Sequence, residues 1–232
     1  MNEQRNFTIL TVAMLFGVFI FTQRDKLVPI SGNQVVVAEE KCVVLDAGHG
    51  GADPGKIGIN GALEKDINLE ITLLVKEYLE AQDVQVVMTR ETEDGLYDAD
   101  ASNKKVQDMK RRIEIIEQTA PDLTVSIHQN SYPEEYVNGA QVFYYTGSNE
   151  GRHIAELLQK SLVERLKPEK QRQVKANNSY YLLKKTSSPI VIVECGFLSN
   201  YAEAEKLSDE AYQEKVAWAI HLGILQYLNG AY

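Results

Sequence analysis

The sequence predicts an α/β fold: a single domain of three layers, in which a mostly parallel, twisted sheet carries helices on both faces. Short apolar runs typical of buried strands alternate with longer segments whose apolar residues recur every three or four positions. The chain is also large enough for one sizeable core, with 232 residues of which 44% are hydrophobic. Strands separated by helices favour a parallel sheet that is covered on both faces.

The strands are expected at the apolar runs of the chain. Cys42–Ala47 is the first, and Pro121 and Pro189 each stand just before a later run. The expected strands are 42–47, 84–89, 123–127, 140–145 and 190–193, with a further extended piece near 180–183.

The helices are expected where the apolar period changes to that of a helix. In 64–81 one face carries Ile67, Ile71, Leu74, Val75, Tyr78 and Leu79. The expected helices are 64–81, 106–119, 152–166 and Glu210–Leu228. Polar loops are expected over 91–103 and 167–175, and we find no internal repeat that would indicate a second domain.

The N-terminus is expected to be a separate appendage, which divides the chain into a signal or anchor segment (1–26), a linker (27–41) and a catalytic domain (42–232). Residues 7–21 are nearly all apolar, with Arg5 before them and charged residues after them. This run is short for a membrane span of about 20 residues but suits the apolar part of a secretory signal. A buried helix is the alternative. Whether the segment is cut or kept as a membrane anchor is open, and in either case we expect the domain to work outside the cytoplasm.

Charge and cysteine content exclude two classes of protein. A net charge of −9 argues against nucleic acid as a partner, because such proteins usually present a basic face. Cys42 and Cys195 are too few for a disulfide framework. On parallel strands they would lie at opposite edges of the sheet, so we expect two unbonded core residues.

A glycine-rich stretch, VVLDAGHGGADPGKIGINGALEKD, follows the first strand and is unlike a phosphate-binding loop. Such a loop passes directly into a helix, whereas here no helix is expected before about Leu63. The carboxyl ends of parallel strands meet at one edge of a sheet. His49 follows the first strand, and His128 and Glu194 end two others, so all three are expected at that edge. The glycines would let the loop return there with Glu64.

Each of these residues also has a structural interpretation. Glu64 could complement the helix dipole, and His128 could be a core histidine. Glu194 is harder to explain, because an unpaired carboxylate at the end of an apolar strand is costly to bury. Two imidazoles and one carboxylate form a known catalytic zinc set, and a further carboxylate can act as general base. His153 and His221 are expected to be structural.

The same motifs resemble a known family. VVLDAGHGG, Glu64, VVMTR (86–90), LTVSIHQN and IVECGFLSN occur in the order found in the zinc-dependent N-acetylmuramoyl-L-alanine amidases, over residues 42–228. The resemblance implies a zinc ion bound by His49, Glu64 and His128, with Glu194 as the catalytic residue. It implies hydrolysis of the amide between N-acetylmuramic acid and L-alanine in peptidoglycan, and it does not identify substrate-binding residues.

The organisation is most similar to the germination-specific amidases of endospore formers. This similarity implies a role in spore-cortex maturation through muramic-δ-lactam formation, and a location in the cell wall or the spore intermembrane space. Without a wall-binding repeat, and with a charge that an anionic wall does not attract, the domain is expected to need a membrane anchor or an activating partner protein.

Two positions depart from the family pattern, and two alternative functions stay open. Glu117 stands where asparagine is usual, and Gln129 where a small residue is common, although Arg112 is retained. These departures bear on contacts around the site or on substrate preference. The alternatives are a zinc peptidase that cuts within the stem peptide, and a non-catalytic domain that binds the wall or activates a partner.

Overall fold

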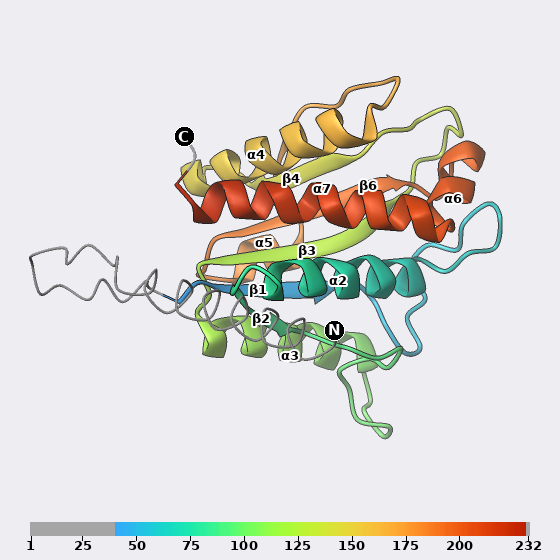
Figure 1. The fold of residues 1–232 in the computed structure, drawn as a ribbon. Helices are drawn as coiled ribbons and strands as arrows, with labels where there is room; N and C mark the ends of the chain where they lie inside the picture. The colour runs from blue at the N-terminus through green and yellow to red at the C-terminus, as the bar shows by residue number, and fades with distance from the viewer. Residues whose placement is uncertain (1–39, 231–232) are drawn as a thin grey trace, which may run out of the picture. The chain divides into compact units, whose positions relative to one another are not determined.

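The predicted α/β class is confirmed by a computed structural model, which describes residues 40–230. One six-stranded sheet has the strand order β2-β1-β3-β6-β4-β5 (Figure 1). The strands are β1 (Cys42–Ala47), β2 (Gln85–Met88), β3 (Leu123–Asn130), β4 (Gln141–Tyr145), β5 (Lys175–Asn177) and β6 (Ile190–Phe197). The helices are α2 (Glu64–Glu80), α3 (Lys104–Thr119), α4 (Asn149–Leu166), α5 (Tyr181–Lys185), α6 (Tyr201–Leu207) and α7 (Glu210–Leu228).

Strand direction places the carboxyl ends of the central strands together. Strands β2, β1, β3 and β6 pair in parallel, whereas β4 is antiparallel to β6 and parallel to β5. His128 on β3 is the register partner of Glu194 on β6. The parallel part of the sheet therefore brings these two residues to neighbouring positions, as predicted from the sequence.

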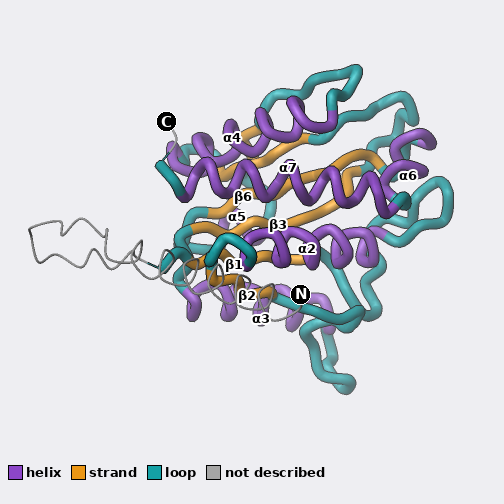
Figure 2. The backbone as a smooth tube through the Cα atoms, viewed as in Figure 1, coloured by secondary structure: helices purple, strands orange, loops and turns teal. Residues whose placement is uncertain are grey.

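Helices cover both faces of the sheet. Helices α2, α4 and α7 lie in front of it in Figures 1 and 2, and their apolar side chains form the larger core cluster with β1, β3 and β6. Helices α3 and α5 pack on the other face, where Ile116 and Leu182 join Val44 and Ile192 in a smaller cluster. Val44 faces one way while its neighbours Val43 and Leu45 face the other, as the alternation of a strand requires.

Three elements differ from the sequence-based expectation. Residues 181–185 form the short helix α5 rather than an extended piece, because Leu182 and Leu183 both turn into the smaller core. Strand β5 is polar and three residues long, so it carries no apolar pattern, and α6 is a seven-residue helix capped by Asn200. Both were missed.

The two long strands also continue past their apolar runs. β3 extends to Asn130 and β6 to Phe197, so His128 and Glu194 lie within strands rather than at their ends. The register shifts between His128 and Asn130, which marks a β-bulge beside the proposed site. The strands remain paired because backbone hydrogen bonding, including Leu198 N to Asn130 O at 2.9 Å, continues where the apolar side chains stop.

Both cysteines are free, as expected. Cys195 is buried within β6, and Cys42 is half-buried at the start of β1. Burial raises the pKa of the Cys195 thiol, which keeps it protonated and unreactive.

The predicted signal or anchor segment 1–26 and most of the linker 27–41 lie outside the described residues. Between residues 40 and 230, no helix has both the length and the apolar character needed to cross a membrane. Among residues 40–230, the members of the two core clusters lie between Val43 and Leu228.

A protein truncated to begin near Val35 should therefore fold, because it retains every core residue that the structure describes. We expect its unfolding temperature and metal uptake to match those of the full chain, measured by thermal unfolding and metal analysis. An insoluble truncation beside a well-behaved full chain would instead show that residues 7–21 belong to the core.

Candidate metal centre

Three residues from distant parts of the chain could hold a metal ion together. His49 follows β1, Glu64 begins α2 and His128 lies on β3; one potential ligand atom from each lies within 4.8 Å of the others. The loop between β1 and α2, drawn in teal in Figure 2, leaves the sheet at His49 and returns at Glu64. The structure therefore brings together the three residues that the sequence predicted as ligands.

Glu64 is the centre of this group. Its Oε1 lies 3.2 Å from His49 Nε2 and 3.0 Å from His128 Nδ1, and the two rings meet edge to face. Its other oxygen accepts a hydrogen bond from Lys56 N at 2.7 Å. Burial raises the pKa of Glu64, but hydrogen bonds from His128 and His49 outweigh burial and hold it well below its usual range. Glu64 is thus a buried, ionised carboxylate.

His49 is held in an unusual conformation by a residue that the sequence did not indicate. Its φ of +63° is rare for a residue with a side chain and is typical of functional sites. Asp53 Oδ2 lies 3.1 Å from His49 Nδ1 and Glu64 Oε1 lies 3.2 Å from its Nε2, so each ring nitrogen faces a carboxylate oxygen and the ring orientation is fixed. The i, i+4 spacing of His49 and Asp53 in the glycine loop is the only sequence signal for this pair.

Two glycines give the side chains of the site the room that they need. A Cβ at Gly48 would lie 2.2 Å from His128 Cε1. A Cβ at Gly55 would lie 2.5 Å from Glu64 Oε2, and Gly55 has a φ of +66°. These contacts explain why backbone without side chains surrounds the histidines.

Two buried arginines hold the backbone that carries His49. Arg112 on α3 donates to Asp46 Oδ1 and Asp108 Oδ2, each at 2.6 Å, and to the carbonyl oxygens of Ala47 (2.7 Å) and His49. Arg90, which follows β2, donates to the carbonyls of Ala47 (2.9 Å) and Gly48 (3.0 Å). The carbonyls of the last residue of β1 and of the two residues after it thereby accept hydrogen bonds from guanidinium groups.

The carboxylate that balances Arg112 is Asp46 at the end of β1. Burial would raise the pKa of Asp46, but the charge of Arg112 and a hydrogen bond from Ser126 lower it to about 2. The pair is entirely buried, with Arg112 only 1% exposed. The sequence analysis noted Arg112 as a family residue but did not predict this role.

Glu194 lies beside the ligand group and lacks a strong partner. It is 7% exposed, its Oε2 has no hydrogen-bond partner among the described residues, and Tyr180 OH is 3.4 Å from its Oε1. Burial raises the pKa of Glu194 to about 7, against the opposing effect of His128. A cation held by the neighbouring histidines would satisfy this carboxylate electrostatically. The residues therefore fit a metal ion, and two imidazole ligands suit a transition metal or zinc.

These residues line a cleft of about 600 Å³ at the carboxyl edge of the sheet. Its lining includes Asp46, Glu64, Glu194 and the two histidines, together with Tyr180 and Tyr181. The cleft is large enough for a ligand, and its polar groups converge on one place.

The other candidate residues lie outside the metal group. His221 is buried between Tyr78 and Trp218, which lowers its pKa, and His153 is half-buried on α4. Glu117 is exposed and accepts two hydrogen bonds from Ser187, and it does not line the cleft.

Gln129, in contrast, supports the site directly. Its backbone N donates to Glu64 Oε1 at 3.1 Å, and its side-chain Nε2 donates to Asn68 Oδ1 at 3.1 Å. Asn68 in turn donates to the carbonyl of Gly48 at 3.1 Å. This departure from the family pattern therefore adds a link between β3, α2 and the glycine loop.

Comparison with known proteins agrees with this geometry. A family model for N-acetylmuramoyl-L-alanine amidases matches residues 43–226. The chain belongs to the N-acetylmuramoyl-L-alanine amidase family. It is an enzyme of that activity, and the family's action on the cell wall implies an extracytoplasmic location.

Several relatives of the amidase are similar over most of its length. The germination-specific N-acetylmuramoyl-L-alanine amidase of Bacillus subtilis (strain 168) is 38% identical over 192 residues, which are 82% of this chain and 80% of that protein. The CwlD amidase of Clostridioides difficile, solved in complex with the GerS lipoprotein, is 40% identical with a TM-score of 0.79, covering 82% of this chain and 99% of that one. AmiC2 of Nostoc punctiforme is 34% identical with a TM-score of 0.72, and the match covers 82% of this chain and 98% of that one.

Replacing Arg112 by lysine should destabilise the amidase by roughly 2 kcal/mol or more, because one ammonium cannot reach two buried carboxylates and two carbonyls at once. Denaturant unfolding measures the effect. Arg111→Lys is the matched control: Arg111 is on the same helix, but its ion pair with Asp98 is at the surface, and we expect a change within about 0.5 kcal/mol. Equal effects of the two substitutions would contradict the role assigned to Arg112.

Proposed function

We propose that the amidase is a zinc enzyme whose ligands are His49, Glu64 and His128. Support comes from the donor set, since two imidazoles and one carboxylate are typical of catalytic zinc sites that leave a position free. It also comes from the hydrogen bond that His49 Nδ1 donates to Asp53, the kind of outer contact that orients metal ligands. When bound, zinc would polarise the scissile carbonyl and favour deprotonation of the attacking water.

Glu194 would move the proton in this reaction. Its unpartnered Oε2 would accept a proton from the attacking water, and the resulting carboxylic acid would deliver that proton to the departing nitrogen of L-alanine. A pKa of about 7 for Glu194 suits both steps, because the side chain can be either a carboxylate or a carboxylic acid near neutral pH. The Tyr180 hydroxyl beside Oε1 would help to orient the carboxylate.

The observation that carries this proposal is a buried carboxylate oxygen without a partner beside a group of three potential ligands. Glu194→Gln should lower kcat by about 10²- to 10⁴-fold, because glutamine keeps the shape but cannot accept the proton. Zinc content and unfolding temperature should change little. Turnover is measured from stem peptides released from peptidoglycan, and zinc by elemental analysis.

His128→Ala is the contrasting variant, because loss of a ligand should remove zinc together with activity. Near-normal turnover by Glu194→Gln would place the general base elsewhere. Mass spectrometry of the products separates the amidase from the alternative peptidase, since only an amidase frees intact stem peptides from the glycan. A chain that binds zinc but releases no peptide would support the non-catalytic alternative.

A role in the spore cortex is the finer part of the proposal. It rests on the similarity to a relative named as germination-specific and to CwlD. The amidase would remove stem peptides so that muramic δ-lactam can form on the exposed lactyl groups. Spores of the producing organism that lack the amidase should contain no δ-lactam, and the unchanged chain, but not Glu194→Gln, should restore it. Normal δ-lactam content without the amidase would overturn this role.

A partner protein and membrane attachment complete the proposal. The C. difficile relative was solved with a lipoprotein, and a chain of net charge −9 has no general attraction to an anionic wall. We therefore expect a comparable partner, or an anchor within residues 1–26, to concentrate the amidase at its substrate. The domain alone should release stem peptides from whole sacculi slowly, and addition of the partner should accelerate release. Rapid digestion by the domain alone at low concentration would contradict the need for either.

A further inference from the structure

The lining of the cleft that contains the proposed metal centre includes two exposed lysines. Of the described residues that line it, three carry a fixed positive charge: Lys104, Lys105 and Arg112. Arg112 is buried and engaged with two carboxylates and two carbonyls. The two lysines are exposed, so only their ammonium groups are available to an anion that enters the cleft.

Lys105 is connected to the proposed metal centre through a single oxygen atom. Asp53 Oδ2 lies 3.4 Å from Lys105 Nζ and 3.1 Å from His49 Nδ1. The Lys105 side chain is 73% exposed, and an ion pair of this kind contributes little to stability. An ammonium group has three donors, so Lys105 can bind a second carboxylate while it keeps Asp53.

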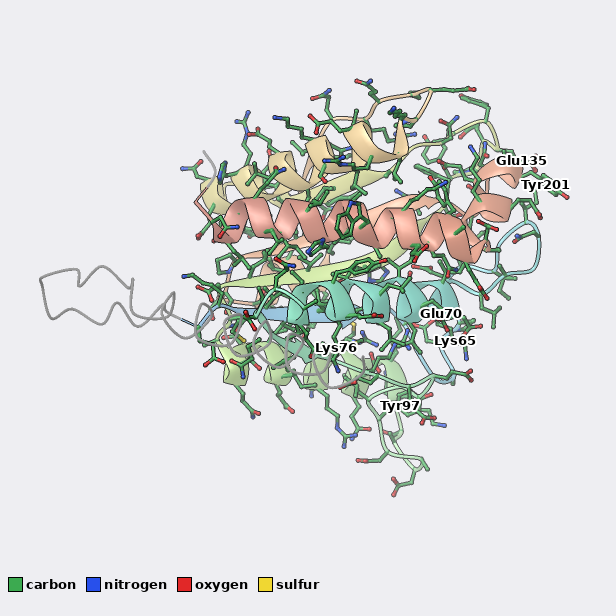
Figure 3. All side chains as sticks on the ribbon, in the orientation of Figure 1. Lys65, Glu70, Lys76, Tyr97, Glu135 and Tyr201 are labelled. Carbon is green, nitrogen blue, oxygen red and sulfur yellow. The ribbon has the colours of Figure 1, made fainter. Side chains whose placement is uncertain are left out.

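Lys104 is placed beside the same loop by an aromatic ring. Its Nζ lies 5.3 Å from the centre of the Tyr97 ring, within the range of a cation–π contact. Tyr97, labelled in Figure 3, accepts a hydrogen bond from Ala52 N through its hydroxyl. Both lysines therefore contact residues that fix the glycine loop, and they approach the cleft from its α3 side.

Their position is unfavourable by local criteria. Lys104 and Lys105 are the first two residues of α3, where positive charge opposes the helix dipole, and the first turn has no acidic residue to offset them. Local rules are most often broken at functional sites.

The chemistry of the substrate identifies the anion, and this step rests on the proposed function. The lactyl carboxyl group of muramic acid is consumed in the scissile amide, and N-acetylated sugars are neutral. The negative charges near the scissile bond therefore belong to the stem peptide. An extended chain spans about 3.3–3.6 Å per residue, so a carboxylate on the residue after L-alanine lies roughly two such steps from the scissile nitrogen.

We infer that Lys104 and Lys105 bind a stem-peptide carboxylate adjacent to L-alanine, and that they make the amidase selective for a free carboxylate over its amide. A charge-assisted hydrogen bond favours the carboxylate, whereas a neutral carboxamide offers lysine a weaker acceptor. The lysines are specificity-determining residues and take no part in proton transfer.

The test uses the full-length chain and two uncross-linked glycan strands whose stem peptides differ only in that group, free acid or amide. We expect kcat/KM to be about tenfold higher for the free acid, chiefly through KM. The double variant Lys104→Met, Lys105→Met should lose this preference, and Lys104→Arg, Lys105→Arg should keep it. A structural defect would lower both rates equally and leave their ratio unchanged.

Lys110→Met is the matched control, because Lys110 is an exposed lysine of α3 that does not line the cleft; it should leave the ratio unchanged. Equal cleavage of both strands by the unchanged enzyme, or a preference that survives the double methionine variant, would overturn the inference. Cleavage of neither strand would overturn the proposed function instead. In that case calorimetry with the two isolated stem peptides decides the inference, since tighter binding of the free acid that is lost in the methionine variant supports it and equal binding refutes it.

Discussion

The site depends on the buried ion pair between Asp46 and Arg112. Asp46 is the last residue but one of β1, and Arg112 donates to it from α3, where the guanidinium is shielded from solvent at 1% exposure. The same guanidinium binds the carbonyls of Ala47 and His49, so the pair fixes the point at which the chain leaves the sheet. Replacing an ion pair by apolar residues is often tolerated, but breaking one by removing a partner is costly. Here the pair also determines where His49 is placed.

Near this ion pair, the pKa values of two carboxylates are shifted in opposite directions. Hydrogen bonds to two imidazoles lower the pKa of Glu64, whereas burial without a strong partner raises the pKa of Glu194 to about 7. Glu64 is thereby suited to remain ionised as a ligand, and Glu194 to exchange a proton. Both residues are buried, and the difference follows from the imidazole hydrogen bonds that reach Glu64 while Glu194 has no comparable donor.

The proposed metal ligands are held in place by a network of hydrogen bonds. Asp53 orients His49, Gln129 and Lys56 donate to Glu64, and Asn68 joins Gln129 to the backbone of Gly48. Three of these five contacts pair a side chain with a backbone N–H or C=O group, so they depend on the path of the backbone as well as on the side chains of Glu64 and Asn68. Lys65, labelled in Figure 3, adds a hydrogen bond from its side chain to the Gly51 carbonyl in the glycine loop.

The sequence by itself determined the fold class, the long amphipathic helices and the four residues of the proposed centre. Apolar periodicity is local, so α7 was predicted with its observed limits, and parallel strands bring His128 and Glu194 to one edge in any sheet of this kind. Only the tertiary structure decided the short elements β5, α5 and α6, which are stabilised by what they pack against and carry little pattern of their own. It likewise decided the partners of the site, Asp53 on His49 and Arg112 on Asp46, because buried charge is satisfied by groups that meet in space and the spacing of residues along a chain does not reveal them.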